Sequence, residues 1–534
     1  MDEAVQTSDL VLTAPAVVPI FVNVGAAVLP AVAAWLASVV APLLRPRELL
    51  RLFRRKPYVP LLLAGGLTGL WFGGSWLYGL ATAATPADRQ AVSVDWADVA
   101  RAILRHEAAV GAAAFAPAQA VGEAPTIFRT DASRDGYDGG PAPRDLTSVW
   151  RFQEYPDEMV LSSPAVVGSR VYGATCALDL GANYGTVFCL DAETGRKIWL
   201  TETAGDEELK GFFSSPAVTA DGRYLVIGQG LHYDKDCALL CFDAATGALH
   251  WRVETPLHIE SSPAIRGDVV VVGAGAIEDE NMKPVSDPGF VLAVRISTGE
   301  VLWRYPVTDP ESSPVFAADG TVYVGSGFNG KAVVALRSEP DDELASRGLD
   351  RVLWTTPTPY PATGAVTLVG DLVIVGGGNG NYVYADPNPA GIVLALDRAT
   401  GRVRWKREMP DAVLGAVAAR EGTLLCAVRN GRAMALSLED GEPLWPEPRA
   451  VSGREALLAA PALAGDLAYL VSRDGYLAIL RASDGSLLEK HYINAEGRPG
   501  EMGLSLSSPT VAGGRVFVGS ETGGLWCFAG RAAE

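Results

Sequence analysis

The sequence is poor in the side chains that bind zinc or form disulfides. Six cysteines and five histidines occur in 534 residues, and no two cysteines are adjacent. They are too few and too scattered for a zinc framework. An excess of positive charge is also missing, because 62 acidic residues outnumber 44 basic ones and leave a net charge of −18. A nucleic-acid-binding surface needs basic residues, so this class of function is excluded.

The acidic excess belongs almost entirely to the C-terminal part of the chain. Residues 1–147 carry 12 basic and 13 acidic side chains, and the remaining residues carry 32 and 49. This distribution predicts a soluble surface on which like charges repel neighbouring molecules, with an acidic ligand site as the alternative.

Charged side chains are absent from two stretches near the N-terminus, residues 10–44 and 57–84. Each exceeds the roughly 20 apolar residues that cross a bilayer. They predict two transmembrane helices, at about 14–44 and 58–82, joined by a basic loop at 45–56. Because Lys and Arg favour cytoplasmic loops, we expect both termini to lie outside the cytoplasm.

Residues 1–84 are therefore predicted to form a membrane anchor, and residues 85–147 a helix followed by a linker. Asp95 can cap this helix, whose apolar stripe predicts a docking surface. In the linker, Arg129–Tyr137 contains an Asp-x-x-x-Asp-Gly spacing. A calcium loop would need more carboxylates at alternate positions, so this segment predicts a turn.

The rest of the chain is built on a repeat. Its clearest copy is Leu190–Trp199, with the pattern Leu-Asp-x-x-Thr-Gly-x-x-x-Trp. The Asp can bond its own backbone and the Gly can adopt the positive φ of a tight hairpin, so the motif predicts a turn followed by a Trp-bearing strand. Further copies lie at 241–251, 294–303 and 396–405, and a weaker one at 438–445.

A second marker precedes each turn. Ser-Ser-Pro begins at residues 162, 214, 261, 312 and 507, and degenerate versions lie at 363–365, 414–416 and 459–461. Two apolar, β-rich runs separate each marker from the next turn. One unit therefore contains four antiparallel strands, which is the composition of a propeller blade.

The ends of the repeat array complement each other. The last unit, Ser507 to Ala529, has only three strands, whereas Ser148–Phe152 is a Trp strand with no preceding unit. Pairing this strand with 525–528 would close a ring of eight blades over residues 148–530. The seventh blade has Leu488–His491 where a Trp is expected, so we expect weaker packing there.

These units resemble the pyrroloquinoline quinone (PQQ)-type β-propeller repeat, whose signature is Ala-x-Asp-x-x-Thr-Gly-x-x-x-Trp. The N-terminal hairpin and the lead-in at 128–137 resemble membrane-anchored bacterial proteins with PQQ-binding-like repeats. The resemblance implies an all-β, eight-bladed propeller on the periplasmic side of the bacterial inner membrane. Quinoprotein dehydrogenases share the repeat with non-catalytic scaffolds of the outer-membrane assembly lipoprotein type, so it implies a fold more than a function.

The quinoprotein side of this resemblance implies PQQ with calcium or a lanthanide, held by Glu, Asn and Asp and often covered by an adjacent cysteine pair. This sequence has no adjacent cysteines, no Cys-x-x-Cys-His haem motif and no matching Glu/Asn/Asp set. We therefore assign no catalytic, cofactor-binding or metal-ligating residue. Cys189, Cys241 and Cys527 stand where other units have Ala, as small buried residues. A Cys176–Cys189 bridge stays open.

Other motifs favour structural roles. Gly325–Gly330 matches Gly-x-Gly-x-x-Gly, but a strand rather than a helix follows it, so it predicts a hairpin. The Ser-Ser-Pro copies are repeated and have no His/Asp partner, which predicts scaffolding rather than a nucleophile. Loops 277–288, 337–350 and 379–390 are unusually long. They suggest a sector that recognises a partner protein, with sequence drift as the alternative.

The sequence therefore favours a membrane-anchored, non-enzymatic propeller that acts as an extracytoplasmic protein-interaction and assembly scaffold. Its expected partners are other envelope or membrane proteins, bound through the blade loops, and no cofactor is expected. The alternative is a PQQ-dependent quinoprotein dehydrogenase, or a quinone- or metal-binding sensor, with PQQ and calcium.

Overall fold

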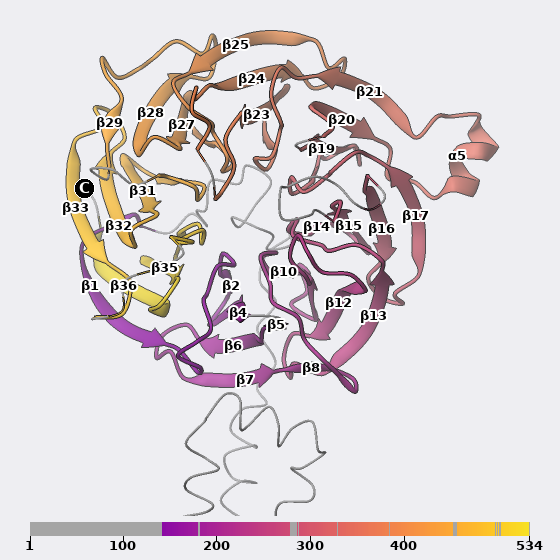
Figure 1. The fold of residues 1–534 in the computed structure, drawn as a ribbon, viewed down its shortest axis with the longest axis horizontal. Helices are drawn as coiled ribbons and strands as arrows, with labels where there is room; N and C mark the ends of the chain where they lie inside the picture. The colour runs from indigo at the N-terminus through magenta and orange to yellow at the C-terminus, as the bar shows by residue number, and fades with distance from the viewer. Residues whose placement is uncertain are drawn as a thin grey trace, which may run out of the picture. The chain divides into compact units, whose positions relative to one another are not determined.

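The computed structural model describes residues 141–532, apart from 180–181, 278–285, 287, 328, 384, 452–455, 497, 499 and 501–502. Eight four-stranded antiparallel sheets are arranged as blades around a central channel (Figure 1). The predicted eight-bladed propeller is thus confirmed. The predicted membrane hairpin and the predicted helix that follows it lie outside the described residues, as does the linker before residue 141. Within the described part, no helix is long and apolar enough to cross a bilayer.

Each blade runs from a short inner strand at the channel to an outer strand at the circumference. The inner strands are β2 (Ala165–Val167), β10 (Ala217–Val218), β14 (Ala264–Arg266), β18 (Val315–Phe316), β22 (Thr367–Val369), β26 (Ala418–Arg420), β30 (Ala462–Ala464) and β34 (Thr510–Ala512). The second strands are β3 (Arg170–Ala174), β11 (Tyr224–Gly228), β15 (Val269–Ala274), β19 (Val322–Ser326), β23 (Leu372–Gly378), β27 (Thr423–Val428), β31 (Leu467–Ser472) and β35 (Arg515–Ser520).

The third strands are β6 (Val187–Asp191), β12 (Cys237–Asp243), β16 (Phe290–Arg295), β20 (Ala332–Leu336), β24 (Gly391–Asp397), β28 (Arg432–Ser437), β32 (Tyr476–Arg481) and β36 (Gly524–Ala532). The fourth strands are β7 (Lys197–Thr201), β13 (Leu249–Thr255), β17 (Val301–Pro306), β21 (Val352–Pro357), β25 (Val403–Met409), β29 (Arg449–Ala450), β33 (Leu487–Tyr492) and β1 (Pro143–Phe152). Loop elements are β4 (Ala177–Asp179), β5 (Ala182–Tyr184), β8 (Thr203–Ala204), β9 (Glu207–Glu208) and helix α5 (Asp341–Arg347).

The hydrophobic core lies between the blades rather than inside any one of them. Second strands such as β23 are buried along their whole length, and third strands such as β12 at every residue but the last, because a blade covers each of their faces. The fourth strands alternate, as in β21, where every second side chain faces solvent. One continuous cluster joins Leu239 of the second blade to Val272 and Leu292 of the third.

The ring closes through the two ends of the repeat array. Strand β1 pairs antiparallel with β36, with Ser148 opposite Phe528 and Phe152 opposite Leu525. The predicted pairing is therefore confirmed. The strand begins at Pro143, before the Ser148 that the sequence indicated. Blade 8 is thus built from the first strand and the last three strands of the propeller.

Each Trp of the repeat links its own blade to the next. Trp199 donates its Nε1–H to the carbonyl of Ala244 at 3.1 Å, and Trp303 donates to Ser338 at 2.8 Å. At Trp199, the turn glycine of the next blade packs against the face of the indole ring. Gly247 has φ +74°, and a Cβ there would lie 2.6 Å from the Trp199 ring. The Gly of the motif therefore serves both the turn and the packing of the preceding Trp.

The seventh blade joins its neighbour by a different contact. Glu489 lies opposite Ile479, the register position that Trp303 occupies opposite Ala293. Its carboxylate accepts the backbone N–H of Leu146 at 2.9 Å and also that of Asp145. A charge-assisted hydrogen bond thus stands where other blades use an indole. The weaker packing expected here stays a prediction.

The Ser-Ser-Pro copies form a chain of hydrogen bonds around the channel. The hydroxyl of the second serine accepts the backbone N–H of its counterpart in the preceding blade. These N–H to Oγ distances are 2.9 Å for Ser163 to Ser215, 3.0 Å for Ser215 to Ser262, 2.9 Å for Ser262 to Ser313 and 2.9 Å for Ser508 to Ser163. The repetition of these serines therefore has a structural cause, as the sequence predicted.

All six cysteines are free and buried. Cys189 lies opposite Tyr172 in the β3–β6 ladder, and Cys176 follows Tyr172 by four residues. At the rise of a strand this offset is about 13 Å, beyond the reach of a disulfide. Burial raises the pKa of the Cys189 thiol to about 12, so this side chain stays protonated and poorly nucleophilic at neutral pH.

Candidate functional site

A cavity of about 120 Å³ lies in the central channel. Its wall includes the second serines of the Ser-Ser-Pro copies and two carboxylates, Glu260 and Glu311. In antiparallel blades, the loops between the second and third strands lie at the same end as the connections from one blade to the next. The segments before the inner strands therefore share that end, called here the 2–3 face, with loops such as 229–236.

The two carboxylates interrupt the symmetry of the repeat. Glu260 and Glu311 each stand immediately before a Ser-Ser-Pro, at the entrance to β14 and β18. The same position holds Leu161, Phe213 and Leu506 in the three other blades that keep Ser-Ser-Pro. The scaffold therefore accepts an apolar residue here, and the two glutamates are a local departure from it.

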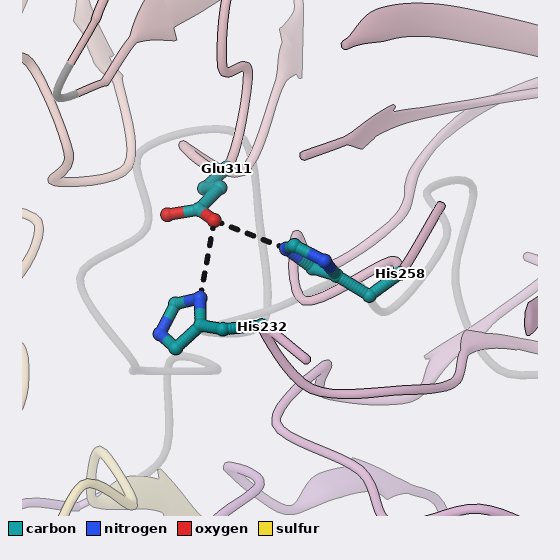
Figure 2. Close-up of side chains that lie close together, drawn as sticks. All are labelled: His232, His258 and Glu311. Carbon is teal, nitrogen blue, oxygen red and sulfur yellow. Dashed lines mark hydrogen bonds and ion pairs between the residues drawn. The ribbon is translucent and has the colours of Figure 1, made fainter. Parts of the chain in front are cut away.

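Two histidines point to the carboxylate of Glu311 (Figure 2). His258, on the connection from β13 to β14, is fully buried, and its Nε2 lies 3.0 Å from Glu311 Oε1. His232, in the loop between β11 and β12, places its Nδ1 3.3 Å from the same oxygen. The two rings are perpendicular, with centroids 5.5 Å apart. Three consecutive blades thus contribute to one cluster.

Glu260 completes the cluster from the side of His232. Its Oε1 accepts the backbone N–H of His232 at 2.9 Å and lies 3.5 Å from Nδ1 of the ring. Burial raises the pKa of Glu260, while the two histidines oppose that shift. Burial acts on Glu311 as well, but attraction to the histidines and their hydrogen bonds outweigh it and hold its pKa well below the usual range. Glu311 is therefore the ionised carboxylate of the cluster, and Glu260 is the more easily protonated one.

Gly275 provides the space that the cluster occupies. A Cβ at this position would lie 2.6 Å from His258 Nε2 and 2.8 Å from Glu311 Oε1. Gly275 directly follows β15, in the third blade's loop between the second and third strands. The absence of a side chain at this point allows His258 and Glu311 to meet.

The arrangement suits cation binding better than nucleophilic chemistry. Two imidazole nitrogens and one carboxylate oxygen lie within 4.8 Å of one another, and these residue types could hold a metal ion. The serine hydroxyls of the wall are hydrogen-bonded to backbone groups of neighbouring blades, as described above. They therefore do not form a Ser–His pair with His232 or His258 among the described contacts.

The sequence contained one signal for this site that periodicity alone did not expose. The histidines are scattered in the sequence, but His232 and His258 lie at the same end of adjacent blades, so their rings meet in the structure. The signal was the Glu before Ser-Ser-Pro in two consecutive units. Of the long loops, 277–288 lies mostly outside the described residues. Loop 379–390 follows the second strand β23 on the 2–3 face, whereas 337–350 joins β20 to β21 and carries α5 away from the ring (Figure 1).

The fold is that of a known protein family. The family described as "Outer membrane protein assembly factor BamB" matches residues 142–388 and 351–534. The outer membrane protein assembly factor BamB of Yersinia pestis is 24% identical over 381 residues, which cover 68% of this chain and 83% of that protein. The crystal structure of BamB from Moraxella catarrhalis superposes with a TM-score of 0.53 at 18% identity, covering 73% of this chain and 99% of that one.

A more limited similarity connects the chain to a dehydrogenase. Quinohemoprotein alcohol dehydrogenase ADH-IIG of Pseudomonas putida is 26% identical over 252 residues, or 45% of this chain and 34% of that protein. The channel cavity does not fit PQQ with calcium. PQQ is a tricarboxylate, and the described residues that line the cavity include two carboxylates but no Lys or Arg. The cavity is also far smaller than the roughly 300–1,000 Å³ of typical cofactor pockets, and imidazoles are poor calcium ligands.

The comparisons correct the predicted location. The sequence placed the propeller at the inner membrane through a transmembrane hairpin, with the termini on the periplasmic side. Several relatives that match about two thirds of the chain are named outer membrane protein assembly factors. No helix in the part that the structure describes could span a bilayer. The inner-membrane assignment was wrong because it rested on uncharged stretches at 14–44 and 58–82, outside the described residues, and on no feature of the propeller.

Proposed function

The chain belongs to the family described as outer membrane protein assembly factor BamB, and on that premise we propose that it is a non-enzymatic scaffold for outer-membrane protein assembly. The observation that carries this proposal is the extent of the match, which runs from residue 142 to 534 and includes all eight blades. We keep the predicted division of the chain into residues 1–84, 85–147 and 148–530. The assembly function is assigned to the propeller, residues 148–530.

The 2–3 face offers a surface for partner proteins. Leu178, Tyr233 and Val383, from loops of blades 1, 2 and 5, are 39%, 61% and 48% exposed. Each belongs to a loop between a second and a third strand, so all three lie at the same end of the ring. Loops on a rigid scaffold are where binding residues usually lie, and these three side chains are available for contact there. The proposed partners are envelope proteins that take part in outer-membrane assembly.

Site-specific photocrosslinking tests this surface. A photoreactive amino acid at position 178 or 383 is expected to crosslink, in intact cells, to components of outer-membrane protein assembly identified by mass spectrometry. The matched control is position 301, where Val is 45% exposed but lies on outer strand β17. Equal crosslinking from position 301, or crosslinks to none of these components from 178 and 383, would contradict the assigned surface.

A further inference from the structure

The geometry points to a binding site for a divalent transition-metal ion, with Zn²⁺ as the best-suited ion, formed by His232 Nδ1, His258 Nε2 and Glu311 Oε1. This site goes beyond the proposed assembly function, which does not require a metal. Two imidazoles and one carboxylate, with a fourth position left for water or another ligand, are a common zinc ligand set. Glu260 stands beside the three ligands, where it can serve as the fourth.

The distances between the ligand atoms suit such an ion. Zinc binds imidazole nitrogen and carboxylate oxygen at about 2.0–2.2 Å, so tetrahedral ligand atoms lie about 3.3–3.5 Å from one another. Here Glu311 Oε1 is 3.0 Å from His258 Nε2 and 3.3 Å from His232 Nδ1. All three atoms lie within 4.8 Å of one another. Small side-chain adjustments therefore place an ion between them.

Charge at the site favours a cation. Glu260 and Glu311 are mostly buried and face the same cavity, whose described lining residues include no Lys or Arg. Burying carboxylates is costly unless a positive charge compensates them. A divalent cation would compensate both carboxylates together.

The residues around the three ligand atoms leave space for an ion and hold the ligands in position. Gly275 leaves open the space next to His258 Nε2 and Glu311 Oε1, where a Cβ would come within 3 Å of both atoms. Glu260 accepts a hydrogen bond of 2.9 Å from the backbone N–H of His232, which holds the start of the loop between β11 and β12 in place. The cavity adjoining both glutamates offers room for a water molecule at the open position.

The two glutamates depart from the pattern of the repeat. Apolar side chains precede Ser-Ser-Pro in the first, second and eighth blades, whereas blades 3 and 4 have Glu. The glutamates of blades 3 and 4 face histidines from the loops of blades 2 and 3. Together they form a single site in a ring of eight otherwise similar blades. A role confined to blade packing would not require these polar side chains.

Zinc and cobalt binding to the full-length protein test the proposal. After metal removal with EDTA, calorimetry with ZnCl₂ is expected to show one ion per chain, and Co²⁺ is expected to give the visible absorption of a tetrahedral site. His232→Asn and Glu311→Gln should each weaken zinc binding by at least about 100-fold, because changes in the surrounding shell alone commonly cost 10–100-fold. Gly275→Ala keeps every ligand and should still weaken binding.

The matched control is His250→Asn, which removes an exposed histidine on β13 and should leave zinc affinity unchanged. Circular dichroism verifies that each variant is folded; if Glu311→Gln is not, His232→Asn and Gly275→Ala decide. The proposal is overturned if the wild-type protein binds no zinc, or if zinc binds to the ligand variants as tightly as to the wild type, which would indicate surface binding only. Neither result bears on the assembly function.

Discussion

Deletion of residues 143–152 is expected to prevent the propeller ring from closing and to cause the protein to associate or aggregate. These residues form β1, the outer strand of blade 8, which pairs with β36 and closes the ring. Without β1, the edge of β36 would be free to pair with other chains. The deletion also removes Trp150 and Phe152 from a cluster that contains Phe188 and Phe517. We expect aggregated or oligomeric protein in size-exclusion chromatography with light scattering.

The control for this deletion is removal of residues 341–347. These residues form α5, which lies in the loop between β20 and β21 and contributes no strand to a blade. The control protein should keep the elution volume, apart from the small loss of mass, and the β-rich circular dichroism of the full chain. A protein that lacks 143–152 but keeps the oligomeric state and the cooperative unfolding of the full chain would show that β1 is not needed for closure.

Trp303→Ala is expected to lower the free energy of unfolding by about 3–5 kcal/mol, the usual range for truncation of a buried Trp. Trp303 is only 2% exposed, donates a hydrogen bond to Ser338, and packs against the guanidinium of Arg351 at 4.4 Å. The substitution leaves a cavity between blades 3 and 4 and an unpaired carbonyl. Urea-induced unfolding followed by tryptophan fluorescence and circular dichroism measures the loss.

Two further variants separate packing from hydrogen bonding. Trp303→Phe retains most of the buried ring but removes the indole N–H, and should cost less than Trp303→Ala. Glu489→Ala changes the equivalent position of the seventh blade, where a carboxylate accepts two backbone N–H groups. If Trp303→Ala were no more destabilising than an exposed surface substitution such as Val301→Ala, the indole would not be the contact that joins adjacent blades.

The fold could be predicted because it is repeated. A turn motif, a Ser-Ser-Pro and a Trp recur together, and each copy supports the interpretation of the others. Even the incomplete last unit was informative, because Ser148–Phe152 supplied its missing strand. The seventh blade could not be predicted in detail, since its contact combines Glu489 with backbone groups more than 300 residues away.

The candidate site could not be predicted from the same regularities. Its residues come from the places where the repeat fails: Glu instead of an apolar side chain before two Ser-Ser-Pro copies, and a His in a loop of variable length. His232 and Glu311 are 79 residues apart and meet because adjacent blades bring equivalent ends together. Local patterns predict the blades, but the convergence of side chains from adjacent blades depends on how the blades are arranged in the ring.

The location was misassigned for a related reason. The uncharged stretches near the N-terminus satisfied the length expected of membrane spans, but hydropathy does not indicate which membrane a protein serves. Similarity over residues 142–534 gave the association with outer-membrane protein assembly that hydropathy could not give.

The central claim, that this propeller supports outer-membrane protein assembly without catalysing a reaction, is tested most directly by deleting its gene in the native bacterium. Quantitative proteomics of isolated outer membranes should show reduced amounts of β-barrel proteins, restored by the wild-type chain and not by a chain with Leu178→Glu and Val383→Glu. Complementation by the matched Val301→Glu variant should be complete. Unchanged outer-membrane protein levels after deletion, with no other family member present to compensate, would contradict the account.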